Sequence, residues 1–179
     1  MGLNPYLEIF DKRTDTNTKV RHWHVAYTAP RAEKRISEQL DRAGIEYYLA
    51  LRTEIRQWSD RLKKVSVPVF PSYIFLHVDR SEYYVALNLP GMVRYVSFGG
   101  STVIISDKNM MDIKKIVDNS ACFELCNTLP APGDPYTIPF GMFKGIEGTI
   151  VRLKGKTQFI LEIQEWGKYL VLPFNDLKN

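Results

Sequence analysis

The stretch GMFKGIEGTIV, at residues 141–151, decides the fold predicted for the C-terminal part of the chain. It spaces three glycines and an aromatic residue ahead of a run rich in β-branched residues. Glycine suits tight turns, where the backbone needs a positive φ or passes close to another chain, and β-branched residues favour strands. Two further short strand patterns, at 158–163 and 169–172, follow Gly155 and Gly167. We therefore predict a small five-stranded β-barrel over residues 135–179.

The composition sets the broad class of protein. With 179 residues, of which 45% are hydrophobic, the chain is long enough for two small domains. Its 24 basic and 20 acidic side chains give a net charge of +4, which is a mild attraction toward polyanions. The two cysteines, Cys122 and Cys126, are too few for a disulfide framework and lack the ligand count of a zinc site. We expect reduced thiols and no metal.

Hydropathy gives no sign of membrane insertion or export. No apolar run approaches the roughly 20 residues that a membrane span needs, and the N-terminus lacks the apolar core of a signal peptide. We therefore expect a cytoplasmic protein. Residues 1–21 are polar and follow neither the helical nor the strand period, so they are predicted to form a flexible leader.

Residues 22–118 are predicted to form an α+β domain, because strand and helix periods alternate along them. The predicted elements are, in order, strand 23–28, helix 30–43, strand 46–57 running into a basic loop or hairpin, strand 67–78, helix 81–89, strand 92–98 and a helix capped by Ser106 or Asp107. This order is compatible with a split-βαβ sandwich, in which helices cover an antiparallel sheet. Residues 119–134, rich in proline and without a periodic pattern, are predicted to be a linker.

The strand predicted at 67–78 is apolar on both faces. Successive side chains of a strand point to opposite faces, so Ile74 and Leu76 share one face while Tyr73 and Phe75 share the other. The face with Ile74 and Leu76, here called the Ile74 set, can pack under helices. The face with Tyr73 and Phe75 then needs a different cover, which either a second layer or a binding partner must supply.

In this order, the motifs of the chain resemble the NusG family. The N-terminal match runs from about Trp23 to Val117 and the C-terminal match from about Gly133 to Leu177. The residues that carry the resemblance are Phe70-Pro71-Ser72-Tyr73, Leu89-Pro90-Gly91, Phe98-Gly99-Gly100, Ile105-Ser106-Asp107 and a KOW-like motif at Gly141, Phe143, Gly145 and Gly148. The segment from Trp23 to Lys34 further resembles the specialised RfaH and UpxY antiterminators of capsule operons.

The resemblance implies a transcription elongation and antitermination factor. Such a factor binds the clamp helices of bacterial RNA polymerase and suppresses pausing and termination, here at specific operons such as those for polysaccharide biosynthesis. The resemblance implies no catalysis and no cofactor. The sequence agrees, because it has no paired carboxylates, Ser-His-Asp set, phosphate loop or metal cluster with suitable spacing.

The resemblance also assigns candidate site residues. Phe70 and Tyr73 match the family's Phe-Pro-x-Tyr pair and Phe75 an aromatic position of RfaH-like members, which implies that they form the polymerase-binding depression. The turn at Trp166, Gly167 and Lys168 matches one that contacts a ribosomal protein or a termination factor in housekeeping members. The basic residues expected near the nontemplate DNA strand are Arg31, Lys34, Arg35, Arg56, Arg61, Lys63 and Lys64.

Several alternatives stay open at this point. The aromatic rings are also consistent with ordinary core packing, and each basic residue with an uncommitted surface charge. A KOW-type RNA-binding module, attached to ribosomal or leader RNA, is the second functional hypothesis. RfaH can hold its C-terminal domain as a helical hairpin, but the glycines here favour strands, since glycine costs about 1 kcal/mol per helical position relative to alanine.

Overall fold

The computed structural model describes residues 19–58, 61–98, 100–119, 124–129, 131–139 and 143–175. Most of the predicted leader, Cys122 and Gly141 of the KOW-like motif lie outside these residues. The chain divides into two compact units, Met1–Ile104 and Ile105–Asn179, and each is described by itself. No helix in the described part of the chain is both long and apolar enough to cross a membrane.

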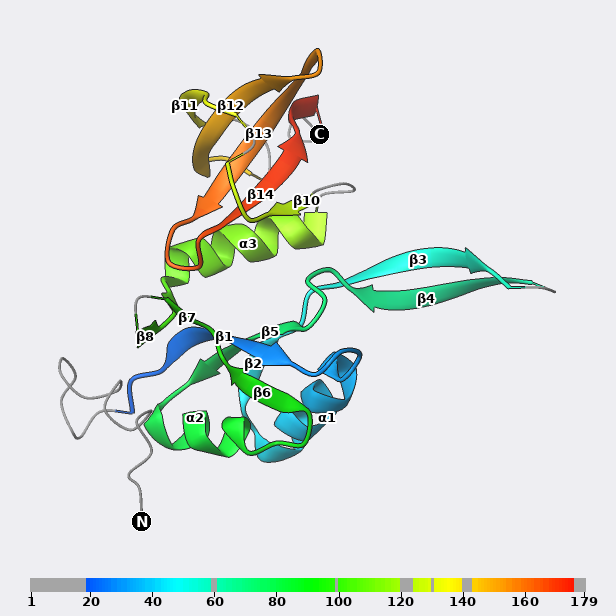
Figure 1. The fold of residues 1–179 in the computed structure, drawn as a ribbon, viewed down its shortest axis with the longest axis vertical. Coiled ribbons are helices and arrows are strands. Elements are labelled where there is room, and N and C mark those ends of the chain that lie inside the picture. Colours follow the sequence, from blue (N-terminus) through cyan, green and yellow to red (C-terminus); the bar gives the residue numbers. More distant parts are fainter. Residues whose placement is uncertain are drawn as a thin grey trace. The chain divides into compact units, whose positions relative to one another are not determined.

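The first unit is built on an antiparallel sheet with the strand order β2-β5-β1-β6 (Figure 1). The elements of the unit that matter here are strands β1 (His22–Thr28), β2 (Glu46–Tyr48), β5 (Tyr73–Val78) and β6 (Met92–Tyr95), and helices α1 (Glu33–Ala43) and α2 (Arg80–Leu87). A short strand, β9 (Ile104–Ile105), also pairs with β1, and β7 (Ser97–Phe98) pairs with β8 (Ser101–Thr102).

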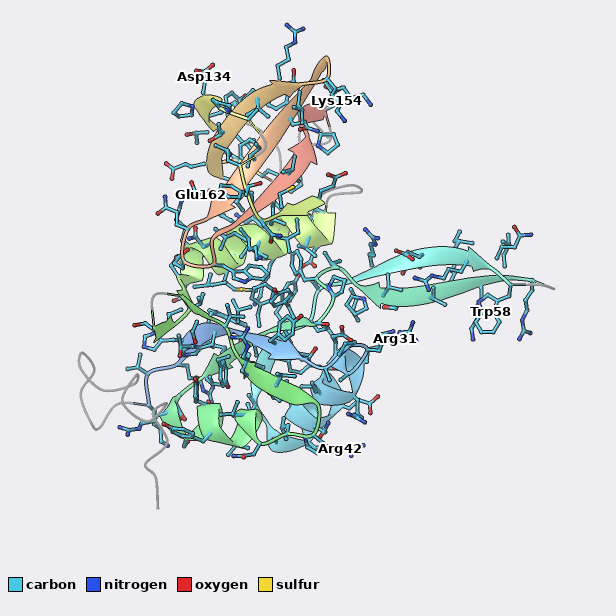
Figure 2. All side chains as sticks on the ribbon, viewed as in Figure 1. Arg31, Arg42, Trp58, Asp134, Lys154 and Glu162 are labelled. Atoms are coloured by element: carbon cyan, nitrogen blue, oxygen red, sulfur yellow. The ribbon has the colours of Figure 1, made fainter. Side chains whose placement is uncertain are left out.

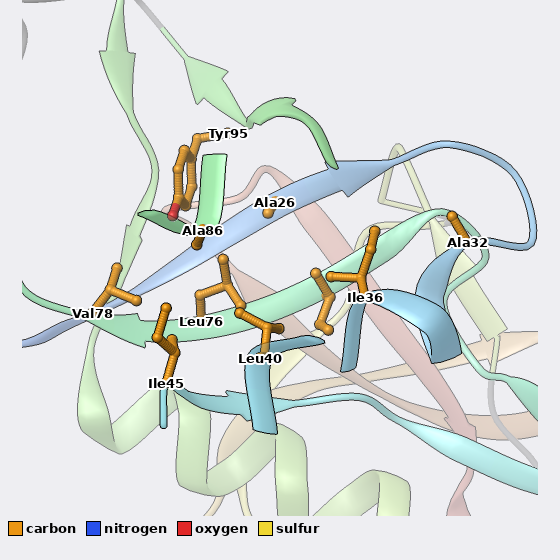
Figure 3. Packing of buried hydrophobic residues seen from close by; sticks show 10 residues of the cluster. Ala26, Ala32, Ile36, Leu40, Ile45, Leu76, Val78, Ala86 and Tyr95 are labelled. Carbon is orange, nitrogen blue, oxygen red and sulfur yellow. The ribbon is translucent and has the colours of Figure 1, made fainter. Parts of the chain in front are cut away.

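One face of this sheet packs under the two helices, as the alternation of β5 predicted. Its core combines the Ile74 set of β5 with apolar residues of α1 and α2 (Figure 3). Ile36 and Leu40 of α1 and Ile74 of β5 are completely buried. The cluster consists of Ala26, Ala32, Ile36, Leu40, Ile45, Ile74, Leu76, Val78, Ala86 and Tyr95. Burying each large aliphatic side chain contributes about 1.5–3 kcal/mol, so this cluster holds the helices on the sheet.

Local signals set the ends of both helices. Helix α1 ends at Gly44, whose φ of 67° is left-handed and whose N–H bonds to the carbonyls of Leu40 and Asp41. Helix α2 begins behind Asp79, whose side chain accepts bonds from the backbone N–H groups of Ser81 and Glu82 while Glu82 reaches back, a capping box.

The strand predicted at 67–78 is in fact two strands separated by a turn. Strand β4 (Leu62–Pro68) ends at a proline, and β5 begins only at Tyr73, after Pro71 and a left-handed Ser72 with φ of 65°. The strand predicted at 46–57 is likewise split into β2 and β3 (Leu51–Gln57). The prediction of a single strand at 67–78 was wrong because proline cannot donate to a sheet ladder, so the two prolines mark a turn rather than a strand entry.

Strands β3 and β4 pair only with each other and form a two-stranded hairpin, here called the β3–β4 hairpin. It extends away from the sheet of its unit (Figure 1). Its apolar residues are not packed into the core, since Ile55 is 65% and Leu62 is 70% exposed. The basic segment expected to be a loop or hairpin is therefore a hairpin, in which residues 51–57 pair with residues 62–68.

The second unit contains a five-stranded sheet in the order β10-β14-β13-β12-β11 and one helix. Its elements are α3 (Asp107–Asn119), β10 (Glu124–Cys126), β11 (Asp134–Thr137), β12 (Glu147–Leu153), β13 (Lys156–Ile163) and β14 (Lys168–Pro173). The three strands predicted behind the glycine-rich stretch are confirmed. The chain is thus α+β, and its β-rich C-terminal region fits a KOW domain.

The two compact units divide the chain between Ile104 and Ile105. The bounds expected from the sequence, 22–118, 119–134 and 135–179, stay a prediction. Helix α3 falls in the second unit, where Lys108 pairs with Glu147 at 3.0 Å and the side-chain amide of Asn109 donates to Glu165. Strand β10, inside the predicted linker, pairs with β14. A three-residue strand held by a partner some 45 residues away in the sequence has no local period, so the sequence pattern did not reveal it.

Candidate functional site

The face of the first sheet opposite the Ile74 set carries a row of rings. We call it the aromatic face; its members are Trp23, Tyr27, Tyr48, Tyr73, Phe75 and His77. Alternation along the strands and the strand register place them together, because residues directly opposite each other in a ladder share a face. The register aligns Tyr27 with Tyr73, Trp23 with His77, and Tyr48 with Phe75.

The rings of the aromatic face contact one another in specific geometries. Tyr27 and Tyr73 meet edge to face with centroids 5.1 Å apart, and Trp23 stacks on His77 at 4.8 Å with planes 13° apart. Phe75 lies 5.8 Å from the ring of Phe70 in an edge-to-face pair. Such pairs contribute about 0.5–1.5 kcal/mol each beyond burial, so the row is a rigid platform rather than a set of independent side chains.

A tight turn ahead of β5 fixes the position of Tyr73. Ser72 is left-handed, its carbonyl accepts from the N–H of Thr28 at 2.9 Å, and the N–H of Tyr73 donates to the carbonyl of Phe70 at 3.1 Å. The N–H of Ser72 donates to Glu33 Oε1 at 2.7 Å, and Glu33 is only 4% exposed. This buried carboxylate at the start of α1 therefore holds the turn.

Two of the three rings predicted to bind polymerase do not form an open surface. Phe75 is completely buried and Phe70 is 2% exposed, whereas Tyr73 is half-buried. Phe75 lies in β5 between β1 and β2, with Phe70 and Tyr48 packed against it. Of the three rings expected to form the depression, Phe70 and Phe75 therefore support the platform and only Tyr73 offers surface.

Arg94 lies beside the exposed rings of the aromatic face, although no pattern in the sequence pointed to it. It lies opposite Tyr27 in the β1–β6 register, is exposed, and places its guanidinium carbon 6.0 Å from the centroid of the Tyr27 ring. Burial raises the pKa of Tyr73, and the neighbouring Tyr27 raises it further, while Arg94 opposes the shift. The surface formed by Tyr27, Tyr73 and Arg94 thus combines apolar rings with one cation. Only the strand register, not a local pattern, brings these three together.

The basic residues predicted to lie near DNA fall into two groups in the first unit. Lys34 of α1 donates from Nζ to the carbonyl of Ser66 in β4 at 2.5 Å, which ties the start of the helix to the β3–β4 hairpin. Arg31 precedes α1 with a left-handed φ of 64° and is exposed (Figure 2). The guanidinium of Arg35 lies against Gly91.

The hairpin itself carries the second basic group. Arg56 pairs with Lys63 in the register, so both side chains share one face, while Lys64 pairs with Ile55 and lies on the other. Arg61 is exposed, and its carbonyl accepts from the N–H of Trp58 at 2.9 Å. The structure therefore brings Arg56 and Lys63 together and separates them from Lys64.

A carboxylate organises the basic face of the hairpin. The Glu54 carboxylate accepts hydrogen bonds from Arg52 at 2.8 Å and from Arg56 at 3.0 Å. Both bonds lower the pKa of Glu54, and the bond from Arg52 has the larger effect. These contacts hold two guanidinium groups in a row along β3. The sequence analysis missed Arg52 and Trp58, although their period-2 spacing with Arg56 was a readable signal.

The C-terminal turn predicted to bind a second protein exposes less side-chain surface than expected. Trp166 is 4% exposed, so its ring belongs to the interior of the second unit. Gly167 is exposed with a left-handed φ of 62°, and half-buried Lys168 donates from Nζ to Asn127 Oδ1 at 2.5 Å. In the KOW-like motif, Phe143 is buried at 1% exposure. No group of three or more His, Cys, Asp or Glu side chains within the described residues is arranged to hold a metal ion.

Comparison with known proteins identifies similar chains. The model of a family described as "Transcription termination factor nusG" matches residues 21–114, more than half of the chain. The transcription termination/antitermination protein NusG of Rickettsia prowazekii is 23% identical, covering 91% of this chain and 92% of its own length. The protein of the same name from Rickettsia felis is 21% identical, covering 89% and 90%. A solved structure on domain interaction in Thermotoga maritima NusG is 20% identical, with a TM-score of 0.48 and coverage of 87% and 95%.

Proposed function

Because the chain belongs to the NusG family, we propose that it is a transcription elongation and antitermination factor that binds bacterial RNA polymerase. Two similar proteins that the chain covers almost completely carry the name of transcription termination/antitermination proteins. The proposed activity is binding rather than catalysis. A bound factor shifts an equilibrium only by its differential affinity for the two states, so this protein must prefer the elongating polymerase to the paused one.

The observation that carries the proposal is the surface formed by Tyr27, Tyr73 and Arg94. Aromatic and arginine side chains are the residues that most often supply the binding energy of an interface. Here the rings are half-buried on a platform of fully buried rings, and Glu33 fixes the turn that places Tyr73. A preorganised surface of this kind loses little side-chain entropy on binding. We assign it to the clamp helices of the polymerase.

The proposal includes a nucleic-acid contact and a second protein partner. Arg31 and Lys34 lie at the start of α1, and Lys34 is bonded to Ser66 of the hairpin that carries the other cations. We assign them to the nontemplate DNA strand, where such a contact would restrict the factor to particular operons, such as those for polysaccharide biosynthesis. The turn at Gly167 and Lys168 is assigned to a ribosomal protein or a termination factor.

Reconstituted transcription tests the proposal. Purified protein is expected to co-elute with RNA polymerase and to raise readthrough at a terminator. Arg94→Ala and Tyr73→Ser remove exposed parts of the proposed surface and are expected to weaken both effects by tenfold or more, as the loss of an interface anchor worth about 2 kcal/mol does. Substitution of Phe70 or Phe75 is unsuitable because both rings are buried and their loss would damage the fold.

Arg42→Ala is the matched control, because Arg42 is an exposed arginine of α1, the helix that covers the opposite face of the sheet. It should leave co-elution and readthrough unchanged. Wild-type readthrough in the Arg94 and Tyr73 variants would remove this surface from the mechanism, and no effect of the wild-type protein would remove the function itself. Sequencing nascent transcripts with and without the factor tests the restriction to particular operons.

A further inference from the structure

The basic face of the β3–β4 hairpin ends in an exposed tryptophan. Trp58 directly follows β3, and it is 55% exposed (Figure 2). The chain has three tryptophans, and the other two, Trp23 and Trp166, are 5% and 4% exposed. A ring of this size normally buries most of its surface in a core or an interface. Among the strands that the structure describes, none outside the hairpin pairs with β3 or β4, so the hairpin offers no sheet core that could take Trp58.

Alternation along the strand and the register place Trp58 among the cations. Positions 52, 54, 56 and 58 of β3 and its extension share one face, and Lys63 joins them through its pairing with Arg56. The ammonium of Lys63 lies 5.5 Å from the centroid of the Trp58 ring, which confirms that both side chains are on this face. The face therefore presents three cations, one carboxylate and one open aromatic ring, together with Val65 and Val67, which pair with Glu54 and Arg52.

The two faces of the hairpin differ in chemistry. The other face carries Ile55 and Leu62, at 65% and 70% exposure, and a single lysine, Lys64. Two of the cations of the Trp58 face are held in place, because Glu54 bonds to both Arg52 and Arg56. The distance from residue 52 to residue 58 along the strand is about 20 Å, at roughly 3.3 Å per residue. This length corresponds to about six nucleotides of a stacked strand.

We propose that the Trp58 face of the β3–β4 hairpin binds unpaired nucleotides, with Trp58 stacking on a base and Arg56 and Lys63 contacting phosphates. Cations along a groove or ridge combined with an exposed aromatic ring are the means by which proteins bind single strands without reading their sequence. In a duplex the faces of the bases are covered by their neighbours, so the ring has nothing to stack on. The inference rests on the proposed function and deepens its nucleic-acid contact: it places the contact on one face of the hairpin and adds Trp58 as the residue that stacks on a base.

Intrinsic fluorescence offers a direct test on the full-length protein, because Trp58 is the exposed tryptophan. Oligothymidylate at low salt is expected to quench the emission, whereas the oligothymidylate–oligoadenylate duplex is expected to quench it little. Oligouridylate serves as a separate arm that distinguishes RNA from DNA. Absence of quenching by both single strands would overturn the proposal.

Single substitutions test which residues of the hairpin account for single-strand binding. The affinity is measured by the fluorescence anisotropy of a labelled oligonucleotide. Trp58→Ala is expected to weaken single-strand binding about 5- to 150-fold, the loss of one base stack, while Trp58→Phe keeps most of the affinity. Lys63→Gln should lower the slope of log affinity against log salt by about 0.7. Ile55→Ala, on the opposite face of the same hairpin, is the matched control and should bind normally.

The possible outcomes separate this inference from the function on which it rests. Equal single-strand affinity of Trp58→Ala and the wild type, or the same loss for duplex as for single strand, would refute stacking. Co-elution with RNA polymerase is measured without added DNA, so it is independent of Trp58 stacking. Normal co-elution together with failed single-strand binding would remove the hairpin site and leave the polymerase contact in place.

Discussion

Replacing Gly148 with alanine should damage the second unit far more than the same change at Gly145. Both glycines belong to the stretch at 141–151, but the structure gives them different tasks. Gly145 has a left-handed φ of 88°, and a Cβ added there meets nothing within 4 Å. Gly148 lies in β12, and a Cβ added there would fall closer than 3.0 Å to the carbonyl oxygen of Ile160 and to the ring of Phe159. The first glycine supplies a backbone conformation and the second supplies space.

The magnitudes follow from these surroundings. At Gly145 an alanine must adopt a left-handed conformation, which costs about 1–2 kcal/mol. At Gly148 the neighbours must retreat by roughly 1 Å; one is the backbone of β13 and the other is Phe159, which is completely buried. Overpacking a well-packed site costs about 1–3 kcal/mol, and neither neighbour is a flexible chain end, so the cost should reach the upper limit of about 3 kcal/mol.

Hydrogen exchange of the β13 amides measures this difference within the full-length chain. A loss of 3 kcal/mol corresponds to exchange about 150-fold faster in amides that open with the whole unit, against about 5- to 30-fold for the Gly145 variant. Amides of β5, in the other unit, serve as the internal control and should be unchanged in both. If Gly145→Ala proves the more damaging, or if Gly148→Ala exchanges like the wild type, the close-approach argument is wrong.

Two further predictions concern the first unit. Glu33→Ala removes the buried acceptor of the Ser72 N–H and should destabilise β5 by about 2–3 kcal/mol, the value of a hydrogen bond to a charged group, while Glu33→Gln keeps an acceptor and should lose less. Hydrogen exchange of the β5 amides measures the difference, and equal exchange rates in Glu33→Ala and Glu33→Gln would show that the bond to Ser72 does not stabilise β5. Burial lowers the pKa of His24 to about 4 from an ordinary value of 6.5. Between these two pH values the unfolded chain binds a proton at His24 and the folded chain does not, so the free energy of unfolding is highest above pH 6.5 and falls by about 3 kcal/mol as the pH falls toward 4. The melting temperature should fall over this range, and His24→Phe should flatten that part of the profile; an equally steep profile in the variant would assign the pH dependence to other groups.

Predictions that rest on local chemistry were confirmed. The end of the first helix at residue 43 and the strands behind the glycine-rich stretch appear where the sequence placed them. Each of these signals is contained within a few residues, since a helix end or a strand depends on backbone freedom and on the local hydrophobic period. The break between β4 and β5 was missed because the apolar run there continues across Pro71.

By itself, the sequence determined the α+β class, the order of most elements, the β-rich C-terminal region and the family. Only the tertiary structure decided which rings are surface and which are support, because the exposure of Phe75 and Tyr73 depends on the neighbouring strands rather than on their own positions in β5. Likewise, the register alone placed Arg94 beside Tyr27 and Lys63 over Trp58. A strand's alternation fixes which residues share a face, but partners far apart in the sequence meet only when the ladder forms.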